Sequence, residues 1–105
     1  MPLSYTALDR NGDTVWSPSA KQRRNLLGSL TADDAEACVS LTHNGQWAIS
    51  AFHSGLVCLE NAGTGEGPWH MTGIPVTEIL ELWQLLTEGN IQELRRLPWQ
   101  DGNGI

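Results

Sequence analysis

The sequence has few basic residues and no long apolar run. Six Lys and Arg residues stand against twelve Asp and Glu residues, which leaves a formal net charge of −6. This charge opposes the phosphate neutralisation on which non-specific nucleic-acid binding depends, so we expect no nucleic-acid partner. No run of eighteen apolar residues occurs, and the first residues do not combine a basic start with an apolar stretch. We therefore expect a soluble cytoplasmic chain with no membrane partner.

Cysteine is also scarce. The two residues present, Cys38 and Cys58, occur in apolar strand-like runs without a C-x-x-C spacing, which fits a reducing compartment. We expect two small buried thiols and no disulfide, because the strands predicted below hold them about 9–10 Å apart. A nucleophilic cysteine is the sharper alternative, but we expect no cation beside either thiol to lower its pKa.

Motifs that carry chemistry are missing as well. The three histidines, His43, His53 and His70, follow none of the usual metal-binding spacings, and the first two lie at opposite ends of the second predicted strand, about 20 Å apart. No Ser-His-Asp or Cys-His constellation can be assembled. The glycine-rich segment 63–67 lacks the Gly-Lys-Ser/Thr that completes a phosphate-binding loop. We expect no metal, no cofactor and no enzymatic activity.

Turn and capping signals predict the fold. Asn44-Gly45 and Ser54-Gly55 divide the central region, residues 37–61, into three strands over 37–43, 46–53 and 56–61. We also expect a loose hairpin over 3–16 and a short fourth strand over 70–74; the sequence leaves open whether the hairpin joins the main sheet. Amphipathic or capped segments predict helices at about 18–30, 77–88 and 91–96, with Ser17, Thr77 and Asn90 as the N-caps. The apolar residues at helical spacing predict which sides of the first two helices are buried: Leu26, Leu27 and Leu30 in the first, and Ile79, Leu82, Trp83 and Leu86 in the second. The prediction is one α+β domain over residues 1–105, with an antiparallel sheet of about four to six strands and the helices packed mainly on one face.

Both turns are expected to be two-residue loops, and these loops also predict the strand registers. His43 then pairs with Gln46, and His53 pairs with Leu56. Alternation of side chains assigns a better core face, made of Ala37, Val39, Leu41, Ala48, Ser50, Phe52, Val57 and Leu59. The opposite face collects Cys38, Ser40, Thr42, Trp47, Ile49, Ala51, His53, Leu56, Cys58 and Glu60.

Tryptophan is unexpectedly frequent: five residues against one Phe and one Tyr. The helical spacing places Trp83 in the core, and we expect Trp16 and Trp99 to close its ends. Trp47 and Trp69 converge on one end of the meander. Two alternatives stay open for this pair: an exposed interaction hot spot, or burial beneath the loop over 62–69 or the first hairpin.

The function that these patterns favour is a small acidic protein-binding module. An inhibitor, an adaptor or an immunity-type antidote that covers a basic partner surface would fit. Trp47 and Trp69 would be its anchors. The acidic patch would be Glu78, Glu81 and Glu88, extended by Glu60 and Glu66. The alternative is a small-molecule binder or unrecognised enzyme that uses the Trp47/His53 sheet face, with the loop over 62–69 as a lid. Its candidate lining is His53, Glu60, Trp69 and His70. A structural homodimer is the third hypothesis.

Overall fold

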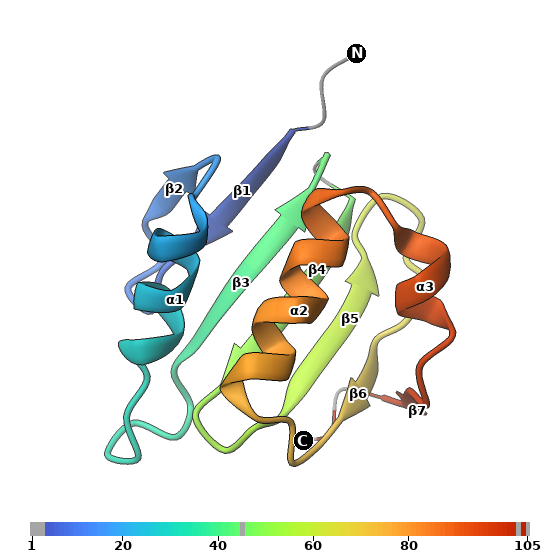
Figure 1. Cartoon of the computed structure of the whole chain (residues 1–105). Coiled ribbons are helices and arrows are strands. Elements are labelled where there is room, and N and C mark those ends of the chain that lie inside the picture. Colours follow the sequence, from blue (N-terminus) through green and yellow to red (C-terminus); the bar gives the residue numbers. More distant parts are fainter. Residues whose placement is uncertain (1–3, 45, 103, 105) are drawn as a thin grey trace.

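The structure, a computed structural model, describes residues 4–44, 46–102 and 104. The helices in this part of the chain are α1 (Ala20–Gly28), α2 (Val76–Thr87) and α3 (Ile91–Arg95). The strands are β1 (Tyr5–Leu8), β2 (Thr14–Trp16), β3 (Cys38–His43), β4 (Trp47–Phe52), β5 (Val57–Asn61), β6 (Trp69–Met71) and β7 (Gln100–Asp101) (Figure 1). The predicted α+β fold is confirmed.

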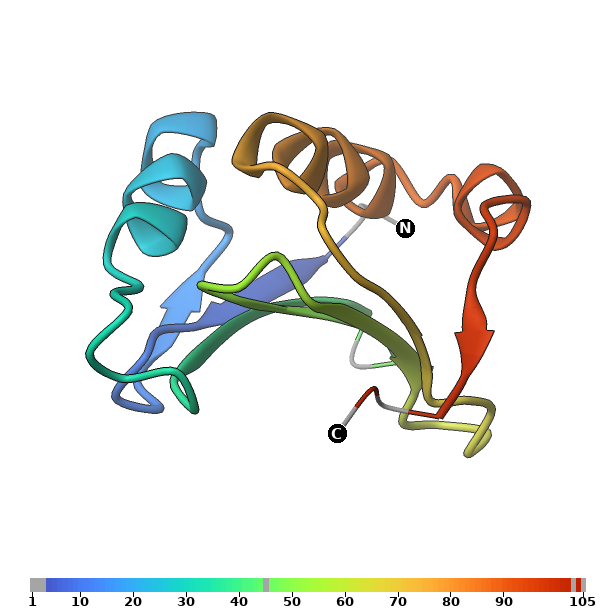
Figure 2. The same ribbon diagram turned by 90° about the horizontal axis from the view of Figure 1, so that it is seen from below.

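All of these strands form one antiparallel sheet in the order β2-β1-β3-β4-β5-β6-β7. The sheet is wider than the expected four to six strands, because the first hairpin and the short β7 both join the meander. The three helices lie on one side of the sheet, as predicted (Figure 2). We call the other side the open face. Mostly small or polar side chains cover its centre: Thr6, Ser40, Thr42, Ala48, Ser50, Cys58 and Glu60.

The helices begin at positions slightly different from those expected. For α1 the N-cap is Ser19, which forms a capping box with Gln22, instead of Ser17. Ser17 has a φ of 46° at the end of β2, and this turn delays the helix start. The N-cap of α2 is Pro75, so Thr77 lies inside the helix. Asn90 precedes α3 as expected, but its side chain makes no capping hydrogen bond.

Both hairpins of the meander have three-residue loops, so the predicted registers are wrong by one residue. His43 pairs with Trp47, and Ala51 pairs with Val57. Gly55 adopts a φ of 89° at the end of the second loop and donates to the carbonyl of Phe52, the arrangement of a type I turn followed by a left-handed residue. Gly45, in the first loop, lies outside the described residues.

In the observed register, each side chain of β4 faces the side of the sheet opposite to the one predicted. Ile49 and Ala51 face the helices and are fully buried, while Ser50 faces the open side. The predicted core face was therefore correct for Val39, Leu41, Val57 and Leu59 and wrong for Ala48, Ser50 and Phe52. Two-residue loops would have buried a hydroxyl and left Ile49 on the open face, so apolar burial favours the longer loops.

The core lies between the sheet and the helices. As predicted, α1 contributes Leu26 and Leu27, and Leu30 packs just after it. The buried side of α2 is the predicted one and consists of Ile79, Leu82, Trp83 and Leu86. The Trp83 indole also donates to the carbonyl of Ile49 at 3.2 Å, which fixes α2 over β4.

A buried arginine joins the two longer helices. The Arg23 guanidinium of α1 donates to Gln84 Oε1 of α2 at 2.8 Å and to the carbonyl of Pro18 at 3.2 Å. It also lies over the Tyr5 ring at 5.9 Å from the centroid. These contacts compensate its lost hydration, so this basic residue is part of the core rather than of the surface.

Candidate binding surfaces

Trp47 and Trp69 do meet, but on the helix side of the sheet. Their ring centroids are 6.3 Å apart with an interplanar angle of 17°. Trp47 pairs with His43 and Asn61, both buried, and therefore points toward the helices instead of lying on the open face as predicted. Both rings are half-buried and pack against the core.

The guanidinium of Arg95, on α3, covers this aromatic pair. Its Cζ lies 5.7 Å from the Trp47 centroid and 5.8 Å from the Trp69 centroid, within cation–π range. Glu66 holds the same guanidinium through an ion pair at 3.6 Å. The cluster thus connects α3 and the loop over 62–69 to the end of the sheet. A hollow of about 220 Å³ remains beside it, lined by Leu59, Trp69, Arg95, Leu97, Trp99 and Asp101.

The other residues expected around this pair lie elsewhere. His53 is exposed in the loop at the opposite end of β4, and Glu60 is exposed on the open face, one residue before Asn61. His70 also lies toward the open face, where its Nδ1 is 3.0 Å from the carbonyl oxygen of Gly102. The predicted surface shared by Trp47 and His53 is therefore not assembled. The small-molecule pocket built on it would need these side chains to converge, and they do not.

Two of the predicted acidic residues lie beside an apolar groove. Glu78 and Glu81 project from α2 along one rim, and both are exposed. We call this depression, about 380 Å³ in volume, the acidic groove. Besides the two carboxylates, its lining is apolar: Met71, Ile74, Leu82, Leu85, Leu97 and Pro98. Glu88 is exposed at the end of α2, outside the groove, and accepts a hydrogen bond from Gln84.

The carboxylates of the acidic groove make none of the ion pairs found in the described part of the chain, which are Arg10–Asp34, Arg95–Glu66 and Arg96–Glu93. They remain available to an external cation. The floor between α2, β6 and residues 97–98 offers apolar area to a side chain that enters it. The arrangement can therefore hold an apolar group with a positive charge beside it.

Sequence reasoning missed the most exposed tryptophan. Trp16 does not close the core: its side chain is 76% exposed on the open face, at the end of edge strand β2. Leu8, 44% exposed, lies on the same face of neighbouring β1. The alternation of Thr14, Val15 and Trp16 could have predicted this exposure. In so short a strand, Val15 and Trp16 point to opposite sides of the sheet, and only one of these sides faces the helices. A hollow of about 330 Å³ lies beside Trp16.

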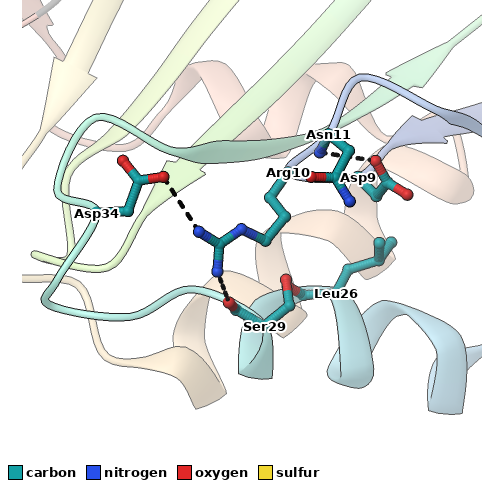
Figure 3. A network of polar contacts seen from close by, with 6 residues as sticks. All are labelled: Asp9, Arg10, Asn11, Leu26, Ser29 and Asp34. Carbon is teal, nitrogen blue, oxygen red and sulfur yellow. Dashed lines mark hydrogen bonds and ion pairs between the residues drawn. The ribbon is translucent and has the colours of Figure 1, made fainter.

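Hydrogen bonds hold the hairpin that carries Trp16. Arg10, in the turn between β1 and β2, donates to the carbonyl of Ser29 at 2.7 Å and to Asp34 Oδ2 at 3.1 Å (Figure 3). In the same turn, Asp9 Oδ1 accepts from the backbone of Asn11 at 2.8 Å. A hollow of about 340 Å³ separates the turn from α1, but its only guanidinium among the described lining residues is occupied by these contacts. We therefore assign this network a structural role.

The cysteine thiols lie on the open face, on strands separated by β4. Cys38 pairs with Phe52 and Cys58 with Ser50, so two strand intervals and an offset of two residues along β4, about 12 Å in all, lie between their positions. Burial raises the pKa of the Cys58 thiol, and the Glu60 carboxylate and Cys38 add to the rise. A raised pKa disfavours the thiolate at neutral pH, which argues against Cys58 as a nucleophile.

No group of three or more His, Cys, Asp or Glu residues that could hold a metal ion occurs within residues 4–44, 46–102 and 104. Over the same residues, no helix has the length and apolarity that crossing a membrane requires. The chain matches no protein-family model, no curated protein and no solved structure at a significant level.

Proposed function

We propose that this chain is an acidic, cytoplasmic protein-binding module. In this proposal, the acidic groove docks a partner segment in which apolar residues are flanked by Lys or Arg. The observation that carries the proposal is the position of the Glu78 and Glu81 carboxylates, which lie without a cation on the rim of an apolar depression. The formal net charge of −6 would attract the same kind of segment at long range.

Apolar contact and charge have separate roles in this proposal. Burial of one medium-sized apolar side chain on the groove floor contributes about 1.5–3 kcal/mol. The carboxylates are exposed, so each contributes less to affinity than to orientation and association rate. A module of this kind binds its partner weakly unless other surfaces add to the contact.

Selection of peptides is the direct experiment. Phage-displayed random peptides are panned on the immobilised chain and counter-selected on the Glu78→Lys, Glu81→Lys double variant. We expect enrichment of Lys or Arg next to Leu, Ile, Met or Phe. A selection that yields neutral or acidic peptides, or none that distinguish the two proteins, would refute the proposal.

Matched variants on α2 then locate the binding site of an enriched peptide. Glu81→Lys should weaken the peptide affinity about tenfold or more, a change of about 1.4 kcal/mol. Glu88→Lys makes the same chemical change on the same helix outside the groove and should change affinity less than about threefold. Fluorescence anisotropy measures both. Equal losses for the two variants would mean that net charge, not the acidic groove, governs binding.

A further inference from the structure

The two edges of the sheet differ in how they are protected. Edge strands are usually blunted by charge, proline or extreme shortness, because they offer unpaired backbone groups to other chains. β7 has only two residues, and one of them is Asp101. β2 contains Thr14, Val15 and Trp16, an uncharged segment of strand-forming residue types without proline. With three residues β2 is also short, but it lacks the charge and the proline that usually blunt an edge strand.

The register of the first hairpin shows which backbone groups this edge offers. The amide of Asp9 donates to Asp13, and the amide of Ser17 donates to Tyr5. In an antiparallel pair, hydrogen-bonded and non-hydrogen-bonded positions alternate, so Val15 bonds inward to Ala7. The N–H and C=O groups of Thr14 and Trp16 consequently point away from β1, toward the free edge.

Exposed apolar side chains lie next to this edge on the open face. Trp16 lies beside Thr6, and Thr14 lies beside Leu8. Trp16 and Leu8 are two of the three large apolar side chains that are exposed within the described residues, the third being Val76. An incoming strand that places a large side chain over Thr14 would reach Leu8 as well, since the next strand is only about 4.8 Å away.

We propose that β2 is a strand-addition site whose occupant is β2 of a second copy of this chain. A two-fold axis midway between the Val15 residues of the two copies pairs the strands antiparallel. Thr14 of each copy then lies opposite Trp16 of the other. These are the residues whose backbone groups point outward, so the pairing forms the narrow hydrogen-bonded pairs that an antiparallel ladder requires. Each Trp16 then covers Thr14 and Leu8 of the other copy.

Charge and rigidity are compatible with this pairing. The same register places Asp13 opposite Ser17, so no two carboxylates are paired. On the helix side, the α1 residues that line the hollow next to Val15 include the uncharged Gln22 and Asn25. The Arg10 network fixes the hairpin in advance, so little ordering is needed on association (Figure 3).

The dimer is independent of the acidic groove, which is formed by α2, β6 and residues 97–98, toward the opposite end of the sheet (Figure 1). Because the paired edge is short, we expect weak association, with a dissociation constant on the order of 10–100 μM. Salt should strengthen it, since two copies of net charge −6 repel each other at long range. Peptide binding to the groove should instead weaken with salt.

Sedimentation equilibrium over a concentration series, up to about 1 mM, tests the dimer. We expect the weight-average mass of the wild-type chain to rise toward twice the chain mass. Trp16→Ala should weaken association about tenfold or more, with the circular-dichroism spectrum unchanged. A wild-type chain that stays monomeric throughout the series, or a Trp16→Ala variant that associates as the wild type does, would overturn the proposal.

Two backbone tests separate strand pairing from hydrophobic contact alone. Thr14→Pro removes a donor that points outward and leaves the bonds to β1 intact, so it should abolish association, whereas Thr14→Ser should leave association unchanged. In hydrogen exchange, the Thr14 and Trp16 amides should become protected as concentration rises, while the Val15 amide is protected at every concentration. Exchange of Thr14 and Trp16 that does not depend on concentration, or a dimer that persists in a folded Thr14→Pro variant, would exclude β2 pairing.

Discussion

At the scale of the residue, Arg95 and Arg96 are neighbours with different surroundings. Arg95 covers Trp47 and Trp69, while Arg96, the residue that follows α3, pairs with the exposed Glu93 of that helix. Arg95→Ala should lower the free energy of unfolding by about 1 kcal/mol, because it removes contacts with two rings. Arg96→Ala, the matched control, should cost less than about 0.5 kcal/mol.

Urea denaturation of both variants measures this difference, and tryptophan fluorescence reports the local change. The emission of Arg95→Ala should shift to longer wavelength, since water reaches the two rings. Equal unfolding free energies for the two variants would show that the cover over the tryptophans contributes nothing to stability.

Cys58 gives a second test at this scale. Its raised pKa predicts slow alkylation at pH 8 and a rate that rises through a midpoint above the ordinary thiol pKa of 9.0. The thiol binds its proton more tightly in the folded chain than in the unfolded one. The associated stability is therefore present below pH 9.0 and is lost as pH rises through the folded pKa.

Iodoacetamide kinetics in a Cys38→Ser background isolate Cys58. Glu60→Gln removes a nearby negative charge and should move the midpoint of the rate profile to lower pH. A midpoint at or below that of a free thiol would contradict the structural environment described for Cys58.

At the scale of the element, the loops determine the register of the sheet more than the strands do. Gly55 ends the second meander loop with a φ of 89°, and a Cβ there would lie 3.0 Å from the backbone nitrogen of Ile74. Gly12 has a similar φ of 85°, but a Cβ there would have no neighbour within 4 Å. A comparison of alanine substitutions at Gly12 and Gly55 therefore separates the cost of backbone strain from the cost of steric conflict.

Gly12→Ala should cost about 1 kcal/mol of stability from the left-handed conformation alone. Gly55→Ala should cost about 2 kcal/mol or more, because Ile74 also donates to the Gly55 carbonyl and cannot move without losing that bond. Thermal denaturation of both variants measures the two losses of stability. If Gly12→Ala is as costly as Gly55→Ala, the close approach of residue 74 is not the cause.

Loop length also limited what the sequence could predict. Asn44-Gly45 and Ser54-Gly55 identify turns because their residues tolerate left-handed backbone, but the same residues serve loops of two or three residues. One additional residue in each loop turned β4 over and moved Trp47 to the helix side. Helix α2 was predictable because its apolar spacing is local and needs no partner to be recognised.

At the scale of the whole molecule, the proposed surfaces lie at opposite ends of the sheet. The acidic groove borders β6, and the dimer edge is β2. The free energies of peptide binding and of dimerisation should therefore be additive. Glu81→Lys should weaken peptide binding and leave dimerisation within about twofold, while Thr14→Pro should do the reverse.

Peptide titration and sedimentation of both variants check this independence. A Glu81→Lys variant that loses the dimer, or a Thr14→Pro variant that loses the peptide, would show that the sites are coupled or that the variant is misfolded. Circular dichroism of each variant distinguishes these two causes.

The sequence by itself determined the α+β class, the buried sides of α1 and α2, and the acidic exposed side of α2, because local periodicity and net charge carry this information. Tertiary structure alone decided the register of β4, the position of Trp47, the exposure of Trp16 and the groove beside Glu78 and Glu81. These features depend on contacts between residues far apart in the chain. The physical reason is that a strand has two equivalent sides until loop length and packing choose which one is buried.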